Sequence, residues 1–178
     1  FAERRNIIMK EKKEKQKKTF LQELPEYILI MAVTALVCTC VICFNKIPSE
    51  SMEPTIHVGA LTVSWRLPFL IGDPVPEHDN IVIFKSPDED KLLIKRLIGL
   101  PGDEIRFQDG DVYRNSQKLE EPYAYGKSYA PLESYTVPDG CMFVMGDNRS
   151  NSKDSRYMTT TFIPLENIQS RYLFAIQR

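Results

Sequence analysis

The distribution of apolar and polar residues divides the chain into three parts. The first 23 residues are mainly polar and carry eight Lys/Arg against four Glu. Residues 27–44 contain no charged side chain, and as a helix they would extend roughly 27 Å, about the thickness of the hydrocarbon core of a bilayer. A buried core helix of this length would show a polar stripe, and this segment has none. The pattern therefore predicts one transmembrane span at residues 27–44.

The basic segment before the span predicts the topology. Because positively charged flanks stay in the cytoplasm, we expect residues 1–26 to form a cytoplasmic tail and residues 45–178 to lie outside the cytoplasm. A cleaved secretory signal is the alternative, but its apolar part is usually about 7–15 residues long, so we expect an uncleaved anchor. Since the sequence begins with Phe1, we expect the natural N-terminus to lie upstream.

After residue 44 the apolar runs are short and turn residues are frequent, which favours a mainly antiparallel β domain. The Asp109-Gly110 pair between two strand-like runs predicts a hairpin, and residues 103–140 are expected to form a small β-hairpin subdomain. No long amphipathic helix is evident. The predicted strands are residues 60–65, 80–84, 92–98, 104–107, 112–114, 118–119, 134–137, 141–145 and 172–176.

Composition narrows the classes of function. The chain has 178 residues and a formal charge of −1, which does not predict a nucleic-acid partner. Cys141 is the single cysteine after residue 44, so the outer domain must fold without an internal disulfide. Two histidines without paired cysteines give no metal signature. We expect neither a metal nor another cofactor.

Lys95 lies in the apolar run Leu92-Leu93-Ile94-Lys95-Arg96-Leu97-Ile98. Side chains alternate along a strand, so Lys95 shares a face with Leu93 and Leu97. Burial among leucines disfavours the charged form of a lysine and can lower its pKa by several units, which would let Lys95 act as a general base. The alternative is a strand lysine that snorkels to solvent.

Ser51 lies between Pro48 and Pro54, whose rings restrict the backbone on both sides of it. A serine hydroxyl next to a deprotonated lysine is a nucleophile that can cut amide bonds without histidine. Ser49 supplies a second hydroxyl, and with the Ser51 backbone N–H it could form an oxyanion hole. A Ser/His arrangement with His57 is a weaker alternative, because a loop histidine more often faces solvent.

Residues 146–156 contain no apolar side chain and directly follow an apolar strand. An exposed polar loop is the simplest interpretation. However, its Asp, Asn and Ser side chains can bond to the backbone, and its charged residues can pair with one another. Such a loop can be rigid enough to hold a catalytic group. The residues expected to form ion pairs are Asp147, Arg149, Asp154 and Arg156.

Together the serine, lysine and polar-loop segments resemble the conserved boxes of type I signal peptidases, and the match extends over residues 27–178. The resemblance implies that Ser51 is the nucleophile, Lys95 the general base and Ser49 an oxyanion-hole donor. It also implies that Ser152 orients the lysine. It further implies support for the polar loop from the backbone of Gly146 and from salt bridges of Asp147, Asp154 and Arg156. Ile47, Pro48, Leu93 and Ile94 match positions near pockets for short substrate side chains.

The same resemblance implies a signal-peptidase/LexA-like antiparallel β domain behind a single anchor in the bacterial cytoplasmic membrane. Its partners would be the lipid bilayer and exported preproteins with A-x-A-like cleavage sites. Family members of the endoplasmic reticulum have histidine at the lysine position, so Lys95 favours the bacterial branch. Two alternatives are a non-catalytic relative that binds exported proteins and a self-cleaving Ser/Lys repressor. The repressor would need an N-terminal DNA-binding domain, where this chain has an apolar run.

Two positions depart from the pattern of many relatives. Residues 158–164, after Tyr157, form a longer exit from the polar loop and lack its usual glycine. Glu50 stands between the two serines, where some relatives carry glycine. Both departures lie next to the expected catalytic serine and polar loop, so we expect them to tune the site rather than remove it.

Overall fold

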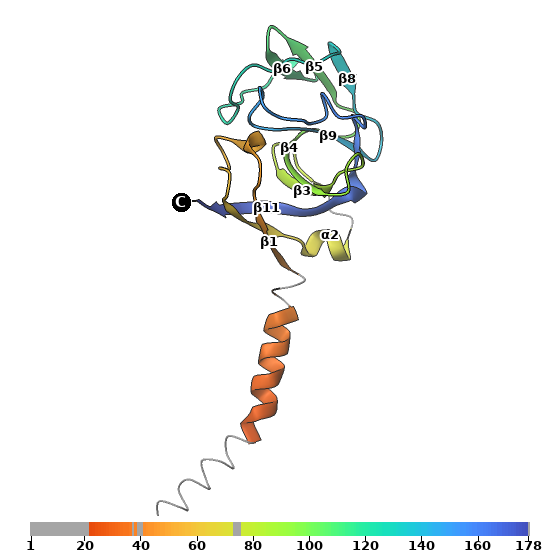
Figure 1. Cartoon of the computed structure of the whole chain (residues 1–178). Coiled ribbons are helices and arrows are strands. Elements are labelled where there is room, and N and C mark those ends of the chain that lie inside the picture. The colour runs from red at the N-terminus through yellow and green to blue at the C-terminus, as the bar shows by residue number, and fades with distance from the viewer. Residues whose placement is uncertain (1–21, 37, 39–40, 73–75, 178) are drawn as a thin grey trace, which may run out of the picture. The chain divides into compact units, whose positions relative to one another are not determined.

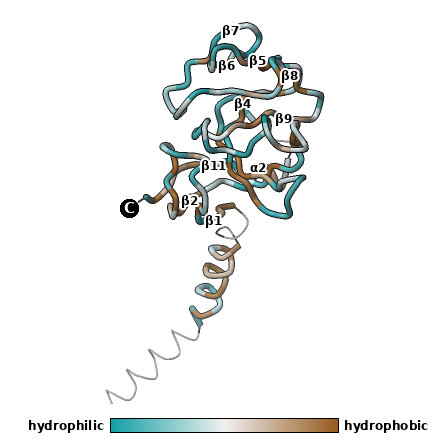
Figure 2. Tube along the Cα trace, turned by 45° about the horizontal axis from the view of Figure 1, so that its top comes forward, coloured by the Kyte–Doolittle hydropathy of each residue, from teal (hydrophilic) through white to brown (hydrophobic). Residues whose placement is uncertain are grey.

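The computed structural model describes residues 22–36, 38, 41–72 and 76–177. The chain divides into two compact units, Phe1–Thr39 and Cys40–Arg178. In the first unit residues 22–36 and 38 are helical, and much of this helix is hydrophobic (Figure 2). Within the described ranges no helix is both long and apolar enough to cross a membrane. Residues 37 and 39–40 of the predicted span, and 1–21 of the predicted tail, lie outside those ranges.

The larger sheet has seven antiparallel strands among the described residues, in the order β1-β2-β11-β3-β4-β9-β10. The long last strand, β11, therefore lies between β2 and β3. Figure 1 shows β11 beside β3. The strands are β1 (Ile42–Lys46), β2 (Leu61–Trp65), β3 (Ile81–Lys85), β4 (Leu92–Gly99), β9 (Cys141–Met145), β10 (Ile163–Pro164) and β11 (Ile168–Ile176).

A second sheet of four strands, in the order β7-β6-β5-β8, is built from the segment between β4 and β9 in the described part of the chain. Its first turn uses Asp109 and Gly110 at φ 55° and 81°, the positive values that a two-residue hairpin turn requires. The predicted hairpin is therefore confirmed. The strands are β5 (Glu104–Gln108), β6 (Asp111–Arg114), β7 (Gln117–Lys118) and β8 (Ser134–Thr136).

Each predicted strand overlaps an observed one, but strands β1 and β10, helix α2 (Leu67–Ile71) and two 3₁₀ helices, Glu50–Met52 and Leu165–Asn167, were missed. Strand β1 includes residues 42–44, which the sequence assigned to the end of the apolar span; an apolar run alone does not distinguish a span from a buried strand. Strand β10 has two residues, and helix α2 has five. Segments this short carry too few periods of the pattern to be recognised.

Strand β4 is the structural centre of the domain because its side chains enter three separate apolar clusters. Leu97 packs with Phe84 and Val144 in the first cluster. Ile98 packs in the second, which includes Ile105, Phe107, Tyr135 and Phe143 and joins the two sheets. Ile94 packs in the third, with Ile47, Met52, Ile56, Ile81 and Ile83. Fully burying one such side chain contributes about 1.5–3 kcal/mol, so the backbone of β4 is held firmly on both faces.

Candidate active site

Ser51 lies in a short 3₁₀ helix, Glu50–Met52, and only 7% of its surface is exposed. The side chain of the next residue, Met52, is fully buried in the third cluster, as is that of Ile56. At the start of the turn, the Gly59 N–H donates to the Ile47 carbonyl at 2.8 Å. Packing and this hydrogen bond therefore hold residues 47–59, the serine turn, in one conformation.

Lys95 lies in β4 and is 3% exposed. Its Nζ donates to Ser51 Oγ at 2.5 Å, so the lysine does not reach solvent. Burial lowers the pKa of Lys95 to about 8, although the negative charges of Asp154 and Asp147 oppose that shift, and Lys91 adds to it. At pH 7 about a tenth of a group with this pKa is neutral, compared with fewer than about one in a thousand for an ordinary lysine. Lys95 can therefore accept a proton from the hydroxyl that it contacts.

Ser49 places a second hydroxyl beside the first. Its Oγ lies 3.4 Å from Ser51 Oγ, within reach of a long hydrogen bond. Because Ser49 has extended backbone immediately before the 3₁₀ turn, its side chain projects beside the Ser51 hydroxyl. When Ser51 Oγ attacks the carbonyl carbon of an amide, the oxygen of that carbonyl would lie close to both Ser49 and Ser51.

A cleft of about 390 Å³ opens over these hydroxyls and the Lys95 amine. Pro48 and Leu93 line it, in agreement with the sequence, whereas Ile47 and Ile94 are buried behind the surface in the third cluster. Glu50 and Met158, which belong to the two departures from the pattern of many relatives, both line this cleft. The remaining lining residues are Glu50, Glu89, Lys91, Asn151, Lys153 and Met158.

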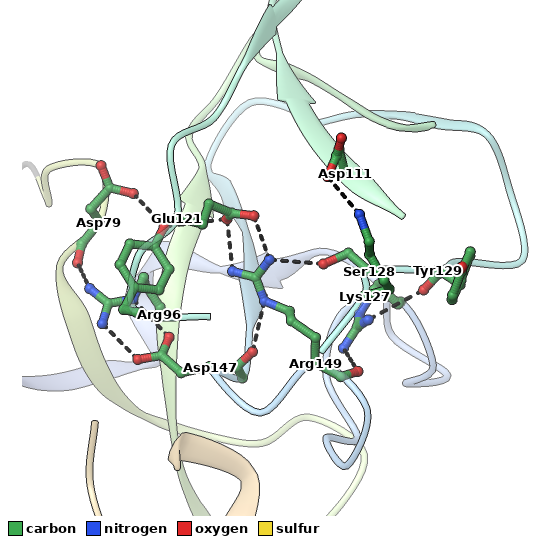
Figure 3. Close-up of polar contacts among 12 residues, drawn as sticks. Asp79, Arg96, Asp111, Glu121, Lys127, Ser128, Tyr129, Asp147 and Arg149 are labelled. Atoms are coloured by element: carbon green, nitrogen blue, oxygen red, sulfur yellow. Dashed lines mark hydrogen bonds and ion pairs between the residues drawn. The ribbon is translucent and has the colours of Figure 1, made fainter. Parts of the chain in front are cut away.

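The polar loop is rigid, but the ion pairs differ in part from those expected. Asp154 and Arg156 pair within the loop through two bonds of 2.8 and 2.9 Å, and both side chains are fully buried. Asp147 instead accepts two bonds, of 2.8 and 2.7 Å, from Arg96 on β4. Arg149 is bound by Glu121 at 2.6 and 2.7 Å, as Figure 3 shows.

Asp147 connects the three segments that form the site. Its carboxylate binds Arg96, the neighbour of Lys95, and also accepts a 2.5 Å bond from the hydroxyl of Thr55 in the serine turn. The next residue, Asn148, donates its N–H to the Ser51 carbonyl at 3.1 Å. The polar loop therefore fixes the distance between the serine turn and the lysine strand.

Sequence reasoning missed Arg96, Thr55, Glu121 and Tyr123. An arginine in an apolar strand was a usable signal, because a buried guanidinium requires a carboxylate partner. Tyr123 stacks on Arg96, whose guanidinium carbon lies 3.7 Å from the ring centroid. Nothing in the local sequence around Glu121 or Tyr123 indicated that they would reach the polar loop.

Ser152 does not make the expected contact with Lys95 in this structure. Its Oγ is buried and has no hydrogen-bond partner among the described residues, while Lys95 Nζ is bonded to Ser51. The hydroxyl nevertheless lies next to the site. A Cβ added to Gly146 would approach Ser152 Oγ to 2.3 Å and the Ser51 carbonyl oxygen to 2.4 Å.

The family model described as signal peptidase, peptidase S26, matches residues 21–176. The chain belongs to this family. A probable signal peptidase I-2 of Synechocystis sp. is 36% identical over 93% of this chain and 78% of its own length. Signal peptidase I of Bacillus licheniformis is 35% identical over 83% of this chain and 84% of its own. Thus the Ser51–Lys95 contact lies within the region shared with peptidases.

Gly146 gives a test of how closely this peptidase site is packed. We expect Gly146→Ala to lower kcat by about 100-fold, since a displacement on the order of 1 Å can cost that much. The added methyl group has no space unless the serine turn or Ser152 moves. Gly72→Ala is the matched control, because its Cβ would make an ordinary 3.6 Å contact with the Pro68 carbonyl oxygen, and neither residue lines the cleft. Equal peptidase activity in the two variants would contradict the prediction.

Proposed function

We propose that this protein is a serine endopeptidase that removes N-terminal signal peptides from exported preproteins, with Ser51 as nucleophile and Lys95 as general base. The observation that carries the proposal is the 2.5 Å contact between Lys95 Nζ and Ser51 Oγ at a buried position. Family membership and relatives named signal peptidase I support the same substrate class.

In the proposed reaction, neutral Lys95 takes the Ser51 proton as Oγ attacks the carbonyl carbon of the scissile amide. The Ser51 N–H and the Ser49 hydroxyl donate to the oxyanion that develops. Protonated Lys95 then gives its proton to the leaving amine, and the mature protein departs. Lys95 next takes a proton from water as the water attacks the acyl ester. It then returns that proton to Ser51 Oγ as the ester bond breaks, which releases the signal peptide and restores both residues.

The surrounding residues would position these groups. Gly146, Asp147, Asp154 and Arg156 hold the polar loop against the serine turn. Ser152 is proposed to bond to Lys95 Nζ when substrate displaces the Ser51 contact, which would satisfy its buried hydroxyl. The small side chains of an A-x-A-like site would occupy the apolar part of the cleft at Pro48 and Leu93, backed by Ile47 and Ile94.

The proposed location is the bacterial cytoplasmic membrane, crossed once by an anchor that begins near residue 27 and ends before strand β1. The N-terminal tail would lie in the cytoplasm and the β domain outside it, as the distribution of basic residues favours. A preprotein held in the same bilayer by its signal peptide would then reach the cleft by diffusion in two dimensions. The lipid bilayer is therefore a proposed partner.

The proposal is tested with the full chain in detergent and a preprotein that carries an A-x-A site. We expect a single cut after the second alanine, identified by sequencing the N-terminus of the product. Ser51→Ala should leave the preprotein intact, and so should a bulky residue in place of the second alanine. A wild-type protein that binds the preprotein without cutting it would support a non-catalytic relative instead.

The pH dependence follows from the lowered pKa of Lys95. Its pKa lies at about 8 rather than 10.5, so the neutral form is lost as the pH falls below 8. We expect kcat/KM to drop by about tenfold per pH unit on the acid side and to level off above about pH 9. Initial cleavage rates between pH 5 and 10 measure this curve.

Lys91 provides the variant for this measurement, because its positive charge helps to lower the pKa of Lys95. Lys91→Met should move the acid limb to higher pH. Lys118→Met, which removes an exposed lysine of the second sheet, should leave the limb in place. A flat profile from pH 5 to 9 in the wild type would show that Lys95 is not the base.

A further inference from the structure

A second hollow, of about 550 Å³, adjoins the catalytic cleft. Asn151 and Lys153 line both, so the two cavities meet along the 151–153 segment of the polar loop. A peptide whose scissile bond lies at Ser51 can therefore continue over this segment into the second hollow. The residues that line the second hollow are Lys127, Tyr129, Arg149, Ser150, Asn151, Ser152, Lys153 and Tyr157.

The second hollow has an excess of positive charge. No acidic residue lines it in the described part of the chain. Lys127 shares the Asp111 carboxylate with Lys118, at 3.2 and 2.5 Å. One carboxylate therefore binds two ammonium groups there, which leaves a net charge of +1. Lys153 shares Glu89 with Lys91 in the same way, but the Asp88 carboxylate also acts on Lys153, so that cluster is close to neutral. The positive charge of Arg149, which also lines the hollow, is balanced by its ion pair with Glu121.

The shape of the hollow is well defined. Tyr129 and Tyr157 expose 62% and 49% of their surface, and the Tyr157 hydroxyl donates to the Tyr129 carbonyl at 2.9 Å. The Lys127 stem packs on Gly110, where an added Cβ would meet it at 2.7 Å. Figure 3 shows Lys127 reaching Asp111 beside Tyr129. Two aromatic rings and an ordered lysine stem form a surface suited to an extended peptide with polar side chains.

We propose that this hollow binds the substrate residues that directly follow the scissile bond, and that Lys127 and Lys153 favour acidic side chains there. The inference rests on the proposed function. The apolar part of the cleft suits the small residues before the bond, whereas the start of a mature exported protein is polar and hydrated. A substrate carboxylate in the second hollow can bind Lys127 and Lys153, because each of these lysines shares its own carboxylate partner with another lysine.

The test uses the full chain in detergent and three preproteins that are identical through the scissile bond. They carry Asp, Asn or Lys at the second and third positions after it. We expect kcat/KM to fall in that order, by about two- to fivefold per step, the range for exposed ion pairs. The difference should shrink in 0.5 M salt, because exposed charges are screened.

Lys127→Met should reduce the spread among the three preproteins to less than about twofold. Lys127→Glu should invert the order. Lys46→Met is the control, since it removes an exposed lysine of β1 that lines neither hollow, and it should keep the wild-type order.

Equal cleavage of the three preproteins by the wild type would overturn the inference. So would a charge preference that survives Lys127→Met in full, or one that responds equally to Lys46→Met. Failure to cut any preprotein would instead count against the proposed function, which separates the two outcomes.

Discussion

Replacement of Lys95 by methionine is expected to lower kcat/KM for preprotein cleavage by on the order of 10⁴-fold or more, because nucleophile and base act as one unit. Methionine keeps an unbranched apolar side chain between Leu93 and Leu97 and removes the cost of a buried charge. The variant should therefore fold at least as well as the wild type. Rates measured with excess preprotein, alongside a thermal midpoint, separate lost chemistry from lost structure.

Lys95→Arg distinguishes a base from a hydrogen-bond donor. Arginine can donate to Ser51 Oγ as Lys95 Nζ does, but a guanidinium stays protonated in proteins and cannot accept a proton. We expect Lys95→Arg to be as inactive as Lys95→Met. An arginine variant that kept a tenth or more of the wild-type rate would show that the lysine only orients the serine.

Replacement of Asp154 by alanine is expected to lower the free energy of unfolding by about 3–5 kcal/mol, the usual effect of removing one partner of a buried ion pair. Arg156 would remain fully buried without its carboxylate, and the Gly146 N–H would lose its 2.9 Å bond to Asp154. For a chain of this size the thermal midpoint should fall by roughly 6–20 °C. Thermal unfolding followed by circular dichroism measures the shift.

Two further variants test the reason for that loss. Adding Arg156→Met to Asp154→Ala removes the uncompensated charge, and it should restore a large part of the stability. Asp90→Ala breaks the Lys85–Asp90 pair, whose side chains are 59% and 90% exposed, and should leave the midpoint unchanged. If Asp154→Ala were as stable as Asp90→Ala, the buried pair would not hold the polar loop.

Much of the β domain could be predicted from sequence because its signals are local. The apolar run at residues 92–98 and the Asp109-Gly110 turn depend on neighbours in the chain, and the strand and the turn were both found where expected. The boundary at residues 42–44 was wrong because apolar residues suit a span and a strand equally. Helix α2 and strand β10 were missed because each is very short.

The candidate site likewise has a part that the local sequence predicted and a part that it did not. The chemical types at Ser51 and Lys95, and the contact between them, were expected from their neighbourhoods. The partners of Asp147 and Arg149 were not, because Arg96 and Glu121 are 51 and 28 positions away in sequence. Before the fold was known, several charged residues of the chain were equally plausible partners for Asp147 and Arg149.

The sequence by itself determined which groups can react, since a serine between prolines and a lysine in an apolar strand are local facts. Only the tertiary structure decided how they are tuned. Arg96 reaches Asp147 because β4 and β9 are neighbours in the sheet, an order that no local pattern specifies. The pKa of Lys95 likewise depends on the groups that exclude water from its ammonium. Desolvation and ion pairing act between residues that meet only when the chain is folded.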